Sequence, residues 1–245
     1  MWTRGLLKQN AKDALRGKYW GCFLVTLVTG ILTGGAGGGG GRAATSVVND
    51  GSSFGTHGSV SPEVVIAALG IMLVGLAVAI AWSCFVAGPL GVGMNRYFME
   101  NRQSKTPFST LWSVFGPGYL NIVKVNFLVN LKIALGSILI IPGIYWGFCY
   151  ALVPYLLAEN PYMTTSRAME LSKELMEGEK WNYFVLGLSF IGWLVLGALC
   201  LGIGTLFVEP YREATFAEFY AAMRSKAFAA GVSDEQELGG FVRHD

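Results

Sequence analysis

Charged residues are scarce in this sequence. Only 14% of its 245 residues are charged and 53% are hydrophobic, whereas a soluble domain carries about 25% charged residues. The few charges lie mainly between apolar blocks, as expected where an ionisable group costs a few kcal/mol at the bilayer centre. The composition excludes an ordinary soluble domain and indicates an integral membrane protein.

The sequence also has few residues that could form a metal or redox site. The two histidines, His57 and His244, lie in a glycine- and serine-rich segment and near the C-terminus. No cysteine has the CxxC or Cys/His spacing of a metal or redox site. We therefore expect no metal, no cofactor, no nucleic-acid partner and no enzymatic activity. The four cysteines all lie in apolar stretches: Cys22, Cys84, Cys149 and Cys200.

The apolar blocks predict an all-α, polytopic transmembrane helix bundle. Six spans arranged as three helical hairpins would form one membrane domain over residues 1–230, with a disordered tail over 231–245. Residues 34–62, rich in glycine, predict a flexible loop. A signal peptide is the alternative for the first block, but no A-x-A cleavage site follows it. The expected spans are 19–35, 63–88, 120–141, 143–158, 182–200 and 203–222.

Length arithmetic supports the hairpins. The apolar stretch from Tyr119 to Ala158 would extend about 60 Å as a helix, twice the hydrocarbon thickness. It should therefore fold back, with the turn at Pro142–Gly143. Residues 181–208 form either one long span or a second hairpin turning at Gly202–Gly204. Six spans keep the cationic clusters on one side, so we expect a bacterial plasma-membrane protein with both termini cytoplasmic.

Two amphipathic helices are expected at the membrane surface. Residues 4–18 place Lys8, Lys12 and Arg16 four residues apart, which favours contact with anionic lipid headgroups. An ordinary positive-inside flank is the alternative for this segment. Residues 163–180 form the second candidate, with a capping threonine or serine at the start.

Three prolines inside apolar segments predict helix kinks. Pro89 and Pro154 are each followed by asparagine at +6 and tyrosine at +8, whereas Pro210 departs from this pattern. Repeated kinks of this kind line cavities in transport folds. The alternative is that a proline followed by an interfacial tyrosine is common in membrane helices.

Polar residues at membrane depth are functional candidates. Lys132 and Glu209 could reach similar depths on neighbouring hairpins and form an ion pair. The alternative is that Lys132 snorkels to the headgroups. Asn126 and Asn130 make the same helix polar on more than one side, which predicts a packed or interfacial segment.

Several blocks together resemble a known family. They read NAKDALRGKYWGCFLV, GPLGVGMNRYF, IPGIYWGFCYALVPYLLAENP, LSKELMEGEKW and SFIGWLVLGALCLGIGTLFVEPYREATFAEFY. In these blocks the chain is similar to the bacterial integral membrane proteins grouped as domain of unknown function 975. The resemblance implies a polytopic helical membrane protein, mainly of Gram-positive bacteria. It supplies no catalytic or binding residues.

Two functions fit these observations. The kinked helices, intramembrane polar residues and basic N-terminal helix favour a transport-like protein that handles or senses a lipid or small amphiphile. The alternative is a non-catalytic scaffold or accessory subunit, partnered by a second copy or another membrane protein. Small residues at Gly187, Gly192 and Gly197 would provide the packing face for that alternative.

Overall fold

The computed structural model describes residues 2–34, 62–199 and 203–241, and every element in these ranges is helical. Most of the glycine-rich loop predicted over 34–62, and Gly202 of the proposed second turn, lie outside the described residues. The elements are α1 (Arg4–Leu15), α2 (Tyr19–Thr33), α3 (Pro62–Trp82), a π-helix (Ser83–Ala87), α4 (Gly88–Gln103), a 3-10 helix (Phe108–Phe115), α5 (Tyr119–Ser137), α6 (Ile141–Cys149), α7 (Val153–Glu159), α8 (Thr165–Leu175), α9 (Lys180–Leu188), α10 (Ile191–Leu199) and α11 (Ile203–Ala229).

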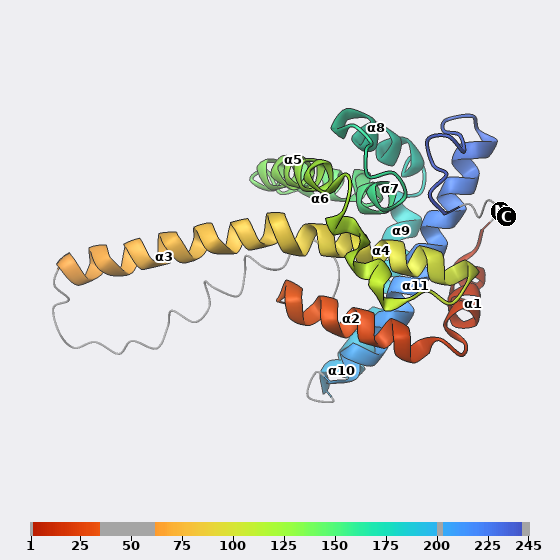
Figure 1. Cartoon of the computed structure of the whole chain (residues 1–245), viewed down its shortest axis with the longest axis horizontal. Coiled ribbons are helices and arrows are strands. Elements are labelled where there is room, and N and C mark those ends of the chain that lie inside the picture. The colour runs from red at the N-terminus through yellow and green to blue at the C-terminus, as the bar shows by residue number, and fades with distance from the viewer. Residues whose placement is uncertain (1, 35–61, 200–202, 242–245) are drawn as a thin grey trace.

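The helices form a packed body from which apolar helices project. Figure 1 shows α3 extending far to one side, with α5 and α6 reaching the same way. Helices α1, α2, α4 and α10 pack along α11, and α7 contacts it through the rings of Tyr155 and Tyr220. The core is dominated by large side chains with under 2% exposure, among them Tyr220, Phe98, Phe190, Phe219, Leu90 and Met99.

Three segments are long and apolar enough to cross a membrane, by length and composition, among the described residues: Leu69–Gln103, Tyr119–Ser137 and Ile141–Glu159. The other expected spans differ. Helix α2 has only 15 residues, the span predicted over 182–200 is divided into α9 and α10, and α11 carries buried charges. The six-span arrangement stays a prediction.

The turn predicted at Pro142–Gly143 is wrong by a few residues. Helix α5 ends at Ser137 and α6 begins at Ile141, so the turn lies between them. Pro142 stands in the first turn of α6, where its missing N–H costs no helical hydrogen bond. Gly143 instead lets α6 approach α5, because a Cβ there would lie 2.5 Å from Ser137 Cα.

The disordered tail predicted over 231–245 is wrong for the residues that the structure describes. Leu238 is fully buried and Phe241 is 6% exposed. Gly240 packs so closely on the carbonyl of Glu159 that no Cβ would fit. Residues 242–245 lie outside the described part of the chain. The tail is therefore part of the body rather than a free extension.

Both amphipathic helices are confirmed as helices. Thr3 caps α1 by accepting a hydrogen bond from the N–H of Leu6, and Thr164 caps α8 by accepting from Arg167. Each cap satisfies one of the free donors of the first turn. Helix α1 buries its apolar face, Leu7, Ala11 and Leu15, against the body.

Candidate functional site

Helix α11 carries carboxylates into the core of the body. Glu209, Glu213 and Glu218 are each 5% exposed, as is Glu159 of α7. A buried charge is tolerated only when it is paired and hydrogen-bonded. The partners of these four groups therefore decide how the body holds together.

Glu159 is paired with Arg224. Its Oε1 lies 2.7 Å from Arg224 Nε, and its Oε2 accepts a 2.7 Å hydrogen bond from the hydroxyl of Tyr220. The Tyr220 ring in turn stacks on Tyr155, with centroids 5.2 Å apart. Arg224 also donates to the carbonyl of Leu238. One arginine thus joins α7, α11 and the C-terminal tail.

Arg212 forms ion pairs with two carboxylates of its own helix. Its guanidinium lies 3.0 Å from the carboxylate of Glu209 and 2.9 Å from that of Glu213. These residues are spaced three and one positions apart, so a single turn of α11 carries the cluster. The local pairing lets a charged turn pack inside an apolar body.

A third pair links α11 to the N-terminal half. Arg102 at the end of α4 donates to Glu218 through Nε at 2.6 Å and through a terminal nitrogen at 3.1 Å. Asn10 of α1 donates to the same carboxylate at 3.5 Å. The bidentate geometry fixes the orientation as well as the charge. It locks α1 and α4 onto α11.

Near each of the three prolines that were predicted to kink a helix, a backbone carbonyl accepts a hydrogen bond from the hydroxyl of a residue on another helix. Pro89 leaves the carbonyl of Phe85 without its usual donor, and Tyr119 donates to it at 2.5 Å. Before Pro210, the hydroxyl of Tyr19 donates to Phe207 at 2.9 Å. A tyrosine from another helix therefore donates to a backbone carbonyl close to each of these two prolines.

The kink predicted at Pro154 is wrong, because Pro154 stands in the first turn of α7, which begins at Val153 after α6 has ended at Cys149. Ser172 of α8 donates to the carbonyl of Cys149 at 2.8 Å. The proposed repeat around Pro89 and Pro154 has no structural counterpart. Tyr97 lies inside α4 and is 3% exposed, whereas Tyr162 follows the end of α7 and is 67% exposed. The sequence echo therefore marks two different environments.

Lys132 and Glu209 are not brought together. The Lys132 ammonium lies 5.5 Å from the ring centroid of Trp146 and 5.1 Å from that of Tyr150, while Glu209 pairs with Arg212. Lys132 is therefore held by aromatic faces, which attract cations.

The two asparagines of α5 also differ. Asn130 is exposed. Asn126 is 8% exposed, and its side-chain nitrogen finds no acceptor among the described residues. It lies beside Gly88, where the π-helix passes into α4. Asn126 therefore packs against the kink at Pro89.

Of the basic side chains in and just after α1, two lie over aromatic rings of the body and one is exposed to solvent. Lys8 lies over the Phe190 ring at 4.8 Å and Lys12 over Tyr211 at 5.8 Å, while Arg16 is exposed. Burial lowers the pKa of Lys8, with Lys12 and Arg4 adding repulsion. Contact of these side chains with lipid headgroups stays a prediction.

A pocket of about 450 Å³ opens where α1 turns into α2. We call it the α2 pocket. Lys18 donates from its ammonium to the backbone carbonyl of Asn101 at 2.8 Å, which fixes this cation at the wall. No acidic residue lines the pocket. Its lining is Gly17, Lys18, Tyr19, Trp20, Gly21, Tyr97, Asn101, Lys105 and Thr106.

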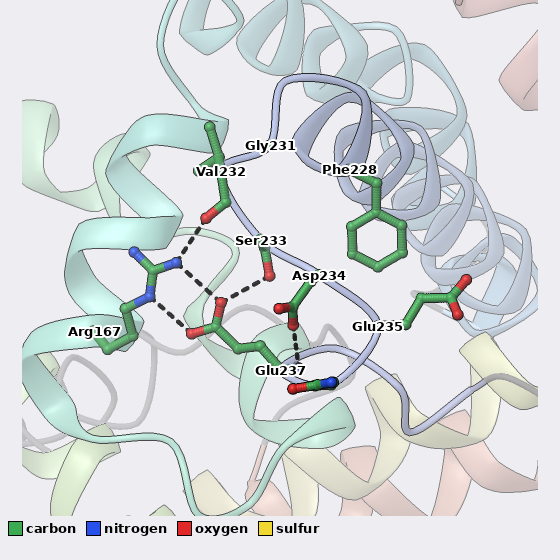
Figure 2. Close-up of a pocket in the computed structure, with 9 residues that line it drawn as sticks. Arg167, Phe228, Gly231, Val232, Ser233, Asp234, Glu235 and Glu237 are labelled. Atoms are coloured by element: carbon green, nitrogen blue, oxygen red, sulfur yellow. Dashed lines mark hydrogen bonds and ion pairs between the residues drawn. The ribbon is translucent and has the colours of Figure 1, made fainter.

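A second pocket, of about 820 Å³, is formed by the C-terminal tail. Figure 2 shows Arg167 of α8 donating to the carboxylate of Glu237 and to the carbonyl of Val232. Ser233 donates to the same carboxylate at 2.8 Å. The hydrogen bond from Arg167 lowers the pKa of Glu237. Because the donors of Arg167 are used by Glu237 and Val232, these hydrogen bonds attach the C-terminal tail to α8.

The Glu237 pair should make attachment of the tail depend on pH. Because the pKa of Glu237 is lower in the folded protein, the pair stabilises the tail at neutral pH. That stabilisation is lost as the pH falls below the ordinary glutamate value of about 4. Amides of residues 231–241 should exchange with deuterium faster at pH 3.5 than at pH 7, after correction for intrinsic rates. Glu237→Gln should abolish this difference, and an unchanged difference would contradict the assignment.

The residues missed by sequence reasoning are mostly long-range partners. Arg102 and Glu218 are separated by 116 positions, and no local pattern joins them. Glu209 and Arg212 did have a signal, because opposite charges three residues apart share a helix face. Among the described residues, no three His, Cys, Asp or Glu side chains are placed to hold a metal ion.

The fold defines the class of protein first: over residues 2–34, 62–199 and 203–241 every element is helical, and three helices are long and apolar enough to cross a membrane. In comparison with known families, residues 108–227, just under half of the chain, match the model described as "Protein of unknown function (DUF975)". The resemblance expected from the sequence is confirmed over those residues. No curated protein and no solved structure matches the chain.

Proposed function

We propose that the protein is a non-catalytic membrane protein that binds a lipid or another small amphiphile at the α2 pocket. Binding is the step that sensing and transport share. The observation that supports this function is one junction, where the cations Lys18 and Lys105 adjoin the aromatic residues Tyr19 and Trp20. Tyrosine and tryptophan favour the membrane–water boundary, where a headgroup and an acyl chain meet.

The exposed face of α2 continues from this junction. Trp20 is 73% exposed, Leu24 is 47% exposed and Ile31 is 70% exposed. Their spacing of four and eleven residues places them on one side of the helix. A polar pocket at one end of an apolar stripe matches a molecule with a polar head and an apolar tail. We place this junction at the cytoplasmic face of the bacterial plasma membrane, following the predicted topology.

Native mass spectrometry of the full-length protein in lipid nanodiscs tests the proposal. The protein should retain lipid, and Trp20→Ser should reduce the retained fraction by roughly threefold to tenfold because apolar contact is lost. Trp181→Ser is the matched control, since Trp181 is 71% exposed but lies on α9. It should leave retention unchanged. Equal retention by both variants would contradict lipid binding at α2.

The scaffold alternative draws on one observation. The apolar window of the span that includes α3 has none of its residues buried within the chain. In a membrane such a helix contacts either lipid or a partner helix. The same mass spectra distinguish these cases, because a species of two or more chains would favour a scaffold or oligomer. A single chain with lipid would favour the first function.

A further inference from the structure

We propose that the α2 pocket binds the anionic phosphate headgroup of an amphiphile, with the acyl chains lying along α2. This inference rests on the proposed function and names the class of ligand. It is carried by the charge of the pocket, by the free donors at the start of α2 and by an unpartnered acceptor in its wall.

The pocket carries cations without counterions. Lys18 uses one donor on the carbonyl of Asn101, and a lysine ammonium has three. Lys105 is exposed and forms no ion pair among the described residues. No carboxylate lines the pocket. Each cation near an anionic headgroup strengthens the attraction, so the pocket selects negative charge.

The start of α2 adds backbone donors. Its N-cap residue, Lys18, makes no side-chain capping hydrogen bond. The N–H groups of Tyr19 and Trp20 have no backbone acceptor among the described residues. Such groups at a helix N-terminus favour an anion, because the helix dipole is positive there.

Asn101 supplies an independent indication of a ligand. This residue lines the pocket and is 2% exposed. Its side-chain nitrogen donates to the carbonyl of Ala14, but its side-chain oxygen has no donor among the described residues. A buried acceptor without a donor is costly. A headgroup that carries a hydroxyl would supply that donor after a small adjustment of the wall.

The apolar stripe on α2 favours a lipid over a free phosphate ester. Trp20, Leu24 and Ile31 extend the site away from the cations along an exposed face. A soluble phosphate would leave this stripe uncovered. An acyl chain anchored at the pocket would cover it, and burial of apolar surface would add to the affinity.

The test measures binding of short-chain lipids to the full-length protein in detergent. Phosphatidylglycerol should bind about tenfold more tightly than phosphatidylcholine with the same chains. Lys105→Gln should remove most of this preference, and because Lys105 makes no ion pair within the described chain the substitution should not disturb folding. Lys173→Gln is the control, since Lys173 is an exposed lysine on α8.

The outcomes separate the two proposals. Equal binding of both lipids, unchanged by Lys105→Gln, would overturn the anionic ligand but leave amphiphile binding intact. Absence of binding by either lipid would overturn both. Glycerol 3-phosphate is the third arm. Weak competition supports a lipid ligand, and displacement of lipid at equal concentration would support a phosphate site for a soluble ester and overturn the role of the acyl chain.

Discussion

Replacing Arg224 with alanine is expected to lower the melting temperature by about 10 °C. The substitution leaves the Glu159 carboxylate, whose side chain is 0% exposed, in the core without its cation. Removing one partner of a buried ion pair costs about 3–5 kcal/mol, and each kcal/mol corresponds to about 2–4 °C in a chain of this size. Thermal unfolding followed by tryptophan fluorescence in nanodiscs measures the change.

Two further variants separate the ion pair from general effects of substitution. Glu170→Ala removes a carboxylate that is 63% exposed and 3.7 Å from Arg167, and it should change the melting temperature by about 1 °C or less. The double variant Glu159→Gln with Arg224→Met should melt above Arg224→Ala, because no charge is left buried. Equal melting of Arg224→Ala and Glu170→Ala would contradict a buried pair.

Gly143→Ala should destabilise the contact between α5 and α6 by about 1–3 kcal/mol, because it forces a methyl group into closely packed backbone. The added Cβ would lie 2.5 Å from Ser137 Cα and 2.7 Å from Ser137 N. A backbone atom cannot rotate away as a side chain can, so the helices must separate. The readout is again the melting temperature.

Gly147 lies one turn further along the same helix and provides the control. A Cβ at Gly147 would meet nothing within 4 Å. Gly147→Ala should therefore leave stability unchanged or raise it by up to about 1 kcal/mol, since alanine favours a helix over glycine. Opposite signs at these two glycines are expected only if α6 faces α5 through Gly143. The same sign at both would contradict this packing.

Local signals in the sequence were sufficient for several helices. The amphipathic spacing in residues 4–18 and 163–180 predicts helices that the structure confirms as α1 and α8, because this spacing depends on residues a few positions apart. The length of the apolar stretch after Tyr119 predicts that it folds back, and in the structure α5 and α6 pack against each other. The turn was misplaced because Pro142–Gly143 resembles turn chemistry, whereas proline in a first turn and glycine at a close contact serve a helix equally well.

Contacts between distant segments could not be predicted from one sequence. Residues 203–222 were predicted to form a membrane span because a turn at Gly202–Gly204 would keep the cationic clusters on one side; in the structure the carboxylates of α11 pair within the body. Glu218 meets Arg102 and Glu159 meets Arg224 only after folding. The tail was misjudged for the same reason, because Leu238 is apolar but lies in a polar stretch. Its burial depends on a surface formed by other helices.

The α2 pocket also arises from distant segments. Tyr19 and Trp20 begin α2, whereas Lys105 follows the end of α4, more than 80 positions later. That Lys18 and Lys105 line one pocket follows from the packing of α2 against α4. The sequence thus contained the chemistry of the site, and folding brought it together.

A structure of the full-length protein in nanodiscs that contain phosphatidylglycerol tests the central claim most directly. The account predicts a lipid with its phosphate between Lys18 and Lys105 and its acyl chains along Trp20, Leu24 and Ile31. An α2 pocket that faces water away from the bilayer, or one filled by protein side chains while lipid binds elsewhere, would contradict it.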